Sequence, residues 1–169
     1  MPITFHPNGT ITGAALTFDV GSGAPGSTVQ HIVVPPQNVN NRSSQNAESW
    51  SGTSITASIT PTSATNRIVI DSAFCCYSDN DSGGGYLSWN NQAGGTSLEL
   101  QKTVIYPKRN WITQPCRFQQ IAGTTSTMTF ELKIKIYNTG TYYTGWESSQ
   151  GSSATNQNGA YCHIMEIKV

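Results

Sequence analysis

The chain has 169 residues, which fits a single domain on the usual scale of about 100–200 residues per domain. Nine basic and nine acidic residues cancel, and charged residues make up only 11% of the chain, so nucleic-acid binding and a polybasic membrane surface are both disfavoured. No apolar run approaches the roughly 18 residues of a membrane helix, and the start of the chain lacks the charged and apolar regions of a signal peptide.

Residue composition favours an all-β fold. The chain contains 14 Ile, 8 Val and 21 Thr but only 5 Leu and 11 Ala. β-branched residues of this kind fit strands better than helices. The 16 Gly and 8 Pro supply turns between many short strands.

The beginning of the chain predicts a short hairpin followed by a flexible joint. Ile3–His6 and Thr10–Thr12 flank a Pro-Asn-Gly run, and Asn-Gly supplies both positive-φ residues of a type I′ turn. The glycine-rich Gly21–Gly26 has the composition of a joint. We therefore divide the chain into an N-terminal docking hairpin with its joint, residues 1–26, and a β-sandwich domain, residues 27–169.

The next segments alternate between expected strands and loops. Thr28–Val34 is a strand that Pro35 ends, and Gln37–Trp50 is expected to form a long polar loop. Thr53–Thr60 sets Ile and Ala against Thr and Ser, as a half-buried strand does. Arg67–Cys76 also predicts a strand, with apolar residues on both faces.

Turn residues separate the strands in the middle of the chain. Asp79–Gly85 is expected to be a tight turn and Tyr86–Trp89 a short strand. Ser97–Tyr106 alternates like a longer strand, and Pro107–Pro115 is expected to be a connection.

The last third contains the clearest strand. Thr127–Tyr137 places apolar side chains on one face and Glu and Lys on the other, so one face should be buried and one wet. Cys116–Ile121 and Tyr161–Val169 predict shorter strands, and Thr139–Asn158 predicts another long polar loop. The total of about eight strands favours a jelly-roll-like antiparallel sandwich of two sheets.

Catalytic and metal-binding patterns are missing from the sequence. The three histidines are His6, His31 and His163, and no nucleophile elbow, zinc-protease or nucleotide-binding motif accompanies them. The run that begins at Asp79 starts like a calcium loop but lacks the later acidic ligand. We therefore expect no enzyme activity, no metal and no cofactor, and a core or interface role for His163.

The four cysteines form no metal-binding pair. Cys75 and Cys76 are neighbours in an expected strand and so point to opposite faces, and no Cys-x-x-Cys spacing occurs. Reduced and mostly buried thiols are favoured for these two, Cys116 and Cys162. One disulfide among the four is the alternative, and the spacing does not say which.

Aromatic residues in polar loops are the strongest indication of binding. Rings flanked by Asn, Gln and Ser combine apolar area with hydrogen-bond partners, which suits sugar faces and protein contacts. The alternative is that such rings pin long loops or lie between subunits. The residues expected to face a receptor or a glycan are Trp50, Trp111, Tyr142, Tyr143 and Trp146.

Three segments resemble virion proteins of tailed bacteriophages. Ile3–Gly13 (ITFHPNGTITG) resembles the short opening of many tailed-phage fibre proteins. Ile55–Ile70 (ITASITPTSATNRIVI) is similar to part of a β-sandwich domain of marine and freshwater phage virion proteins, although Arg67 replaces a usual Ser-Lys pair. Gly83–Leu98 (GGGYLSWNNQAGGTSL) is similar to the glycine-rich turn and short strand of that domain.

The resemblance covers roughly residues 28–169 and implies a homotrimeric, non-enzymatic virion protein that is assembled in the host cytoplasm. Its implied role is the head of a tail fibre, which adsorbs to a host surface polysaccharide or protein. Fibre proteins usually carry a shaft or anchor before this domain, whereas about 26 residues precede it here. Ile3, Phe5 and Ile11 are therefore expected to dock the chain onto other virion proteins.

Two other functions stay open at this stage. A capsid decoration (cement) protein also suits a short, uncharged chain without a shaft. A free carbohydrate-binding module explains the aromatic residues but not the hairpin. Trimer formation has one physical argument, because both faces of Arg67–Cys76 and Tyr161–Val169 carry apolar residues. Either a neighbouring subunit or a covering loop such as Gln37–Trp50 would bury the second face.

Overall fold

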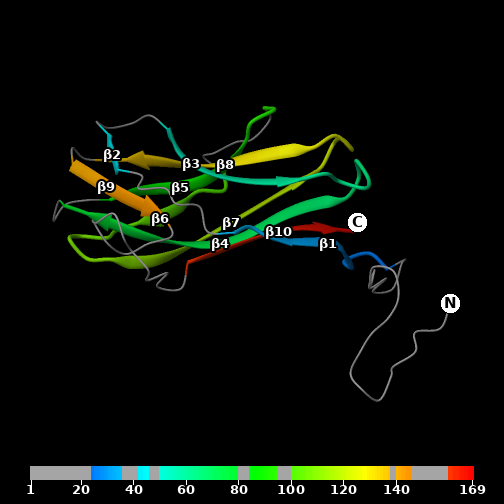
Figure 1. Ribbon diagram of the computed structural model, residues 1–169, viewed down its shortest axis with the longest axis horizontal. Coiled ribbons are helices and arrows are strands. Elements are labelled where there is room, and N and C mark those ends of the chain that lie inside the picture. The colour runs from blue at the N-terminus through cyan, green and yellow to red at the C-terminus, as the bar shows by residue number, and fades with distance from the viewer. Residues whose placement is uncertain are drawn as a thin grey trace, which may run out of the picture.

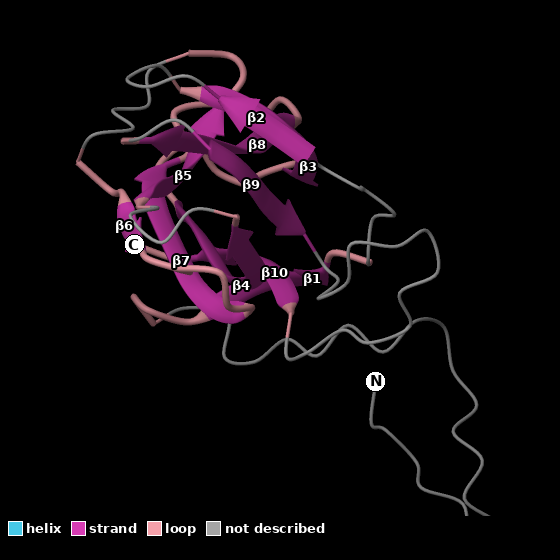
Figure 2. Ribbon diagram, turned by 90° about the vertical axis from the view of Figure 1, so that its left-hand side faces the viewer, coloured by secondary structure: helices cyan, strands magenta, loops and turns pink. Residues whose placement is uncertain are grey.

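The computed structural model describes residues 24–35, 42–45, 50–79, 84–94, 100–137, 140–145 and 160–169. Within these ranges the protein is all-β, without a helix, and two antiparallel sheets pack face to face (Figure 1, Figure 2). The expected all-β sandwich of two sheets is confirmed. The N-terminal hairpin, with Ile3, Phe5 and Ile11, lies outside the described residues.

Ten strands make up the two sheets within the described ranges. Sheet A contains β1 (Thr28–Val33), β2 (Arg42–Gln45), β4 (Arg67–Ser78), β7 (Ile112–Ile121), β9 (Gly140–Gly145) and β10 (Tyr161–Ile167). Its order is β1, β10, β4, β9, β2, and β7 pairs with the other edge of β4. Sheet B contains β3 (Ser51–Ile59), β5 (Gly85–Asn91), β6 (Thr103–Ile105) and β8 (Met128–Ile136), in the order β3, β8, β5, β6.

The long strand β4 organises sheet A. Along one edge it pairs with β7 from Arg67 to Cys76. Along the other edge, β10 pairs with β4 as far as Ala73, and β9 takes over from Cys75 to Ser78. The end of β9 and the start of β10 therefore pair with nearby positions on one strand.

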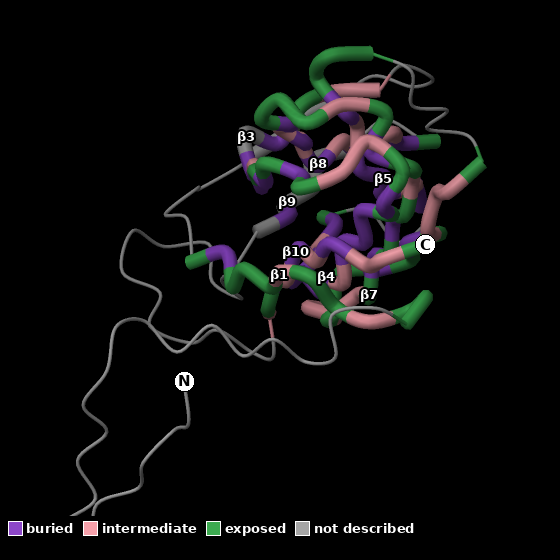
Figure 3. The backbone as a smooth tube through the Cα atoms, turned by 90° about the vertical axis from the view of Figure 1, so that its right-hand side faces the viewer, coloured by how far each residue is buried: buried purple, intermediate pink, exposed green. Residues whose placement is uncertain are grey.

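Period-two alternation explains the core. In β8 every second residue from Met128 to Ile136 is buried, and the residues between them are half-buried. The same alternation in β4 sends Phe74 inward, where its ring centroid lies 5.9 Å from that of Trp89 in β5. Figure 3 shows the buried positions concentrated between the two layers. Removal of this apolar surface from water is the main favourable contribution to folding.

The cysteines are buried as expected: Cys76, Cys116 and Cys162 lie in the core between the sheets, and Cys75 lies on the other face of β4. All four are buried and free. Burial raises the pKa of Cys76, Cys116 and Cys162 to about 12. They therefore behave as small apolar side chains rather than as reactive thiolates.

Two strands occur where polar loops were expected. β2 lies within Gln37–Trp50 and β9 within Thr139–Asn158, and the two strands pair with each other. The expectation of about eight strands was therefore too low. Neither strand carries an alternating apolar pattern. β9 also pairs with β4, and ladder hydrogen bonds to this buried strand define its place.

The region around the β6–β7 connection also differs from expectation. Of the strand expected over Ser97–Tyr106, the described residues form only β6, and Leu100 is 84% exposed. β7 begins at Ile112, so Pro115 lies inside a strand and not in a connection. Proline is tolerated there because β4 is the only sheet partner of β7 among the described residues, which leaves one edge without a ladder.

The two ends of the sandwich differ in what they carry. The Gly26 N–H donates to the Lys168 carbonyl oxygen at 2.7 Å, so the start of the domain and the end of the chain lie together. At the opposite end, which we name the distal end, β4 ends at Ser78, β8 ends at Ile136 and β5 begins at Gly85 (Figure 1). The connection from β6 to β7 also lies at the distal end, where the Arg109 N–H donates to the carbonyl oxygen of Ser78.

Candidate functional site

Three aromatic rings meet on the outer face of sheet B at the distal end. Trp50 directly precedes β3, Tyr86 lies in β5 and Tyr137 follows β8. The ring centroids of Trp50 and Tyr86 are 6.4 Å apart, and those of Tyr86 and Tyr137 are 4.6 Å apart in an edge-to-face arrangement. Tyr86 faces outward because its neighbour Leu87 occupies the core. The contacts hold the three rings in fixed positions relative to one another.

A glycine pair brings a fourth ring to this face. A Cβ on Gly85 would collide with the Lys135 carbonyl oxygen, so glycine permits the close approach of β5 to β8. A Cβ on Gly84 would lie 2.9 Å from the Tyr106 ring, which therefore packs directly on the backbone there. The Tyr137 N–H donates to the Gly84 carbonyl oxygen at 3.0 Å. Tyr106 and Tyr137 thus lie on either side of Gly84.

Four of the five lysines of the chain lie on this face or at its edge. The Lys102 Nζ is 4.2 Å from the centre of the Tyr86 ring, and the Lys108 Nζ is 5.9 Å from the centre of the Tyr106 ring. Both are cation–π contacts. Lys133 and Lys135 take outward positions of β8, where Lys135 pairs in register with Tyr86. We name this surface the lysine–aromatic face: Trp50, Tyr86, Tyr106, Tyr137, Lys102, Lys108, Lys133 and Lys135.

The centre of the face holds one acid and one buried hydroxyl. The Glu131 carboxylate lies 2.6 Å from the Lys133 Nζ, and both side chains are about one-fifth exposed. Ser88 pairs in register with Lys133 and is fully buried. Among the described residues its hydroxyl finds no hydrogen-bond partner. Within the described ranges, the face therefore carries four lysines and one acid.

A second aromatic contact lies at the distal end of sheet A. The ring centroids of Trp111, just before β7, and Tyr77, in β4, are 5.2 Å apart. In β9, Tyr143 pairs in register with Tyr77, and Tyr142 pairs with Ser78. Tyr77, Tyr142 and Tyr143 are therefore neighbours in the sheet, and Trp111 contacts Tyr77 from the start of the next strand.

A strained turn connects the two aromatic groups. The Asn110 N–H donates to the Pro107 carbonyl oxygen at 2.8 Å, and the two residues between them, Lys108 and Arg109, have φ of 41° and 58°. Such values are uncommon for residues other than glycine and cluster at functional sites. The Arg109 N–H and Nε donate to the carbonyl oxygens of Ser78 and Asp79 at 2.8 and 3.0 Å. The turn is thereby tied to the end of β4.

The structure places the five residues expected to face a ligand in two groups. Trp50 belongs to the lysine–aromatic face. Trp111 contacts Tyr77 on the other sheet, and Tyr142 and Tyr143 lie beside that contact in register. Trp146 lies outside the described residues.

Sequence reasoning missed Tyr86, Tyr106 and Tyr137, although the signal for two of them was present. Tyr137 shares the outward positions of Lys133 and Lys135 in the alternation of β8. Tyr86 alternates with the inward-facing Leu87. Aromatic residues at the outward-facing positions of a strand are also candidates for binding, whereas the sequence analysis selected only aromatic residues in or beside loops.

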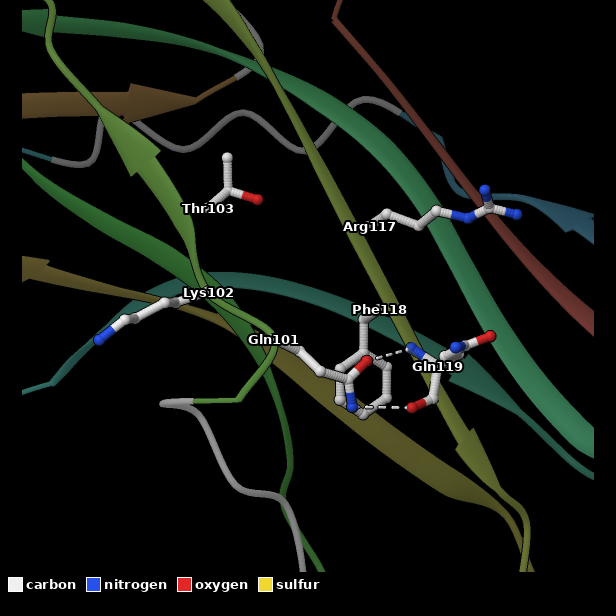
Figure 4. A pocket seen from close by; sticks show the side chains of 6 residues that line it. All are labelled: Gln101, Lys102, Thr103, Arg117, Phe118 and Gln119. Carbon is white, nitrogen blue, oxygen red and sulfur yellow. Dashed lines mark hydrogen bonds between the residues drawn. The ribbon is translucent and has the colours of Figure 1, made fainter.

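A cavity of about 400 Å³ lies beside β6 and β7 and is polar (Figure 4). The side-chain amide of Gln101 reaches across it to the backbone of Gln119. Figure 4 shows that Lys102 and Arg117 point away from each other. Their charges therefore do not converge on one ligand, and the main role of Gln101 is to cover the edge of β7.

His31 and His163 lie away from the distal end, and His6 lies outside the described residues. His31 Nε2 and His163 Nδ1 are 2.9 Å apart across β1 and β10. His163 is half-buried on the outer face of sheet A, so a core position is wrong for it. Within the described ranges, no group of three or more His, Cys, Asp or Glu side chains could hold a metal ion. The same residues include no helix long and apolar enough to cross a membrane.

No family model matches the chain, and a search of curated proteins finds no relative of it. Its function therefore has to be inferred from its residues and their arrangement.

Proposed function

We propose that this chain is a host-adsorption module of a tailed-bacteriophage virion, of the tail-fibre type, which binds a receptor and carries out no reaction. The observation that carries the proposal is that the two ends of the sandwich carry different features. The chain enters the domain beside its own C-terminus, and the lysine–aromatic face, the Trp111–Tyr77 contact and the strained turn lie at the opposite end. A module attached to a particle through its first residues would present that end outward.

The architecture also suits binding in physical terms. The rings of Trp50 and Tyr86 are held by strands and by one another, so little conformational entropy is lost when a ligand orders them. Aromatic side chains supply large contact areas with few rotatable bonds. A rigid face of this kind favours recognition, and the resemblance of Ile3–Gly13 to fibre openings supports its place on a virion.

A homotrimer is part of the proposal. On the outer face of sheet A, Val29, Val33 and Tyr161 are 41%, 62% and 39% exposed, and Met165 and Ile167 beside them are partly exposed. Apolar residues in such a row suit contact with a second copy of the chain. Three copies would also present three receptor sites at once, which raises the overall affinity through effective concentration.

Light scattering behind a sizing column tests the assembly. A mass near three times 18.2 kDa that persists on dilution is expected. A monomer would overturn the trimer. Replacing Val33 by Ser, on the exposed part of β1, should shift the protein towards lower mass, whereas Val104→Ser on sheet B should not.

Immunogold electron microscopy tests the location. An antibody against the purified chain is applied to particles assembled from the genome that encodes it. Label at the tips of tail fibres is expected. Label over the capsid shell would support a decoration protein instead, and particles without label would overturn a virion role.

A further inference from the structure

We infer that the lysine–aromatic face binds an acidic polysaccharide, which gives the chemical class of the receptor and rests on the proposed function. The inference starts from the distribution of charge. The chain as a whole is neutral and has few charged residues, yet Lys102, Lys108, Lys133 and Lys135 all lie on or beside one face. The fifth lysine, Lys168, lies at the other end beside Gly26.

Charge and aromatic surface coincide on this face. The Lys102 ammonium group lies over the Tyr86 ring, and Lys135 pairs with Tyr86 across the sheet. Trp50 and Tyr137 contact the same ring. A ligand that packs an apolar sugar face on the rings therefore brings its substituents within reach of two ammonium groups.

The substituent that fits is an anion. Among the described residues of this face, Glu131 is the acid, and the Lys133 ammonium group already lies 2.6 Å from it. Counted over the described residues, this face holds four lysines and one acid, which is an excess of positive charge. A carboxylate or a sulfate on a sugar ring would complete this pattern, whereas a neutral sugar would leave the lysines without a role in binding.

A nucleic-acid strand also combines negative charge with rings that stack. It is disfavoured here because the chain has no net positive charge, and phosphate-tracking proteins carry a basic stripe along the whole path of the strand. The cations of this protein are concentrated around one aromatic cluster instead. An acidic saccharide needs only local charge.

Binding of defined polymers to the purified full chain tests the inference by calorimetry. The probes are sodium polygalacturonate, which carries carboxylates, and dextran sulfate, which carries sulfates. Their controls are poly-glutamate, which has carboxylates but no sugar, neutral dextran, and oligo(dT). We expect binding to polygalacturonate, to dextran sulfate or to both, and the one bound identifies the anion.

Variants locate the site. Lys102→Gln and Lys135→Gln should each weaken binding by about threefold to fivefold, because each removes one surface charge contact. Tyr86→Leu keeps an apolar side chain but loses the ring and should weaken binding by about tenfold. Lys168→Gln is the matched control for the two lysine variants, since it removes the same charge away from the distal end and should stay within about twofold. Thermal unfolding verifies that each variant folds.

Several outcomes would overturn the inference. These are no binding to either acidic polymer, dextran bound as tightly as dextran sulfate, poly-glutamate bound as tightly as polygalacturonate, tighter binding of oligo(dT), and equal losses in Lys168→Gln and Lys102→Gln. The immunogold microscopy distinguishes a wrong ligand class from a wrong proposed function. Labelled fibre tips without polymer binding overturn the acidic ligand alone. Polymer binding at the mapped residues without label on particles supports the ligand and overturns the virion role.

Discussion

The side-chain amide of Gln101 pairs with the backbone of Gln119 in both directions. The Gln119 N–H donates to Oε1 at 2.7 Å, and Nε2 donates to the Gln119 carbonyl oxygen at 2.8 Å (Figure 4). The amide thus replaces one rung of a ladder on the edge of β7 that faces away from β4. Pro115, four residues earlier in the same strand, lies on that edge too and offers no N–H. Both features protect the edge against pairing with another chain.

We predict that Gln101→Ala lowers the free energy of unfolding by about 1 kcal/mol, because two backbone groups of an edge strand lose their partners. It should also increase self-association at high concentration. Urea unfolding and sizing chromatography measure the two effects. Gln92→Ala, in the exposed turn after β5, is the control and should change neither. Unchanged stability in Gln101→Ala would mean that water replaces the amide fully.

Two buried serines should respond in opposite ways to replacement by alanine. Ser72 Oγ donates to the Cys116 carbonyl oxygen and accepts from Trp89 Nε1 at 3.1 Å. Ser72→Ala leaves the buried indole N–H unpaired and should cost about 1–3 kcal/mol of stability. Ser88→Ala removes a hydroxyl that finds no partner in the described structure and should be neutral or stabilising by up to about 1 kcal/mol. Urea unfolding of both variants and the wild type compares them directly, and a large loss in Ser88→Ala would reveal a hydrogen bond to that hydroxyl.

The buried Glu166 should make stability depend on pH. Burial opposes its ionisation, but hydrogen bonds from Gln30, Asn66 and Thr62 outweigh that effect and hold its pKa below the ordinary 4.5. Because the folded-state pKa is the lower one, the stabilisation is fully present above about pH 4.5 and is lost as the pH falls through the folded-state value. Unfolding in urea at a series of pH values should show this loss.

Glu166→Gln tests the origin of that pH dependence. The carboxylate accepts from Thr62, Ser63 and Asn66 through Oε1 and from Gln30 through Oε2, and an amide nitrogen at either position accepts nothing. The variant should lose about 1–3 kcal/mol at neutral pH and less at low pH, where the wild type is itself protonated. A constant difference between the two proteins across the pH series would contradict this assignment.

The four thiols should resist modification in the folded protein. Burial raises the pKa of Cys76, Cys116 and Cys162 to about 12 and also raises the pKa of Cys75, so almost no thiolate is present at pH 8. We expect iodoacetamide to add nothing over an hour under native conditions and to add four groups in urea, as measured by intact mass. Rapid addition of one group to the native protein would mean that one strand opens readily.

Much of the sandwich followed from local pattern. The alternation of apolar and charged residues from Met128 to Ile136 predicted a strand with one buried and one wet face, because side chains alternate between the two faces of any strand. Thr53–Thr60 was recognised for the same reason, and the apolar residues on both sides of β4 indicated a strand buried on both faces. Glycine and proline marked most of the boundaries.

Other features depended on partners far away in the chain. β2 and β9 contain too few apolar residues for a sequence pattern to predict them as strands. They form because each completes the hydrogen bonds of a neighbouring strand. Pro115 is compatible with a strand because β4 is the only strand that pairs with β7 among the described residues. Sequence alone identified Trp50 as a candidate for binding, but which residues surround it was decided by register. Pairing of β3, β8, β5 and β6 brings Trp50, Tyr86, Tyr137 and Lys102 together from positions up to 87 residues apart, since only the alignment of neighbouring strands determines which outward side chains share a surface.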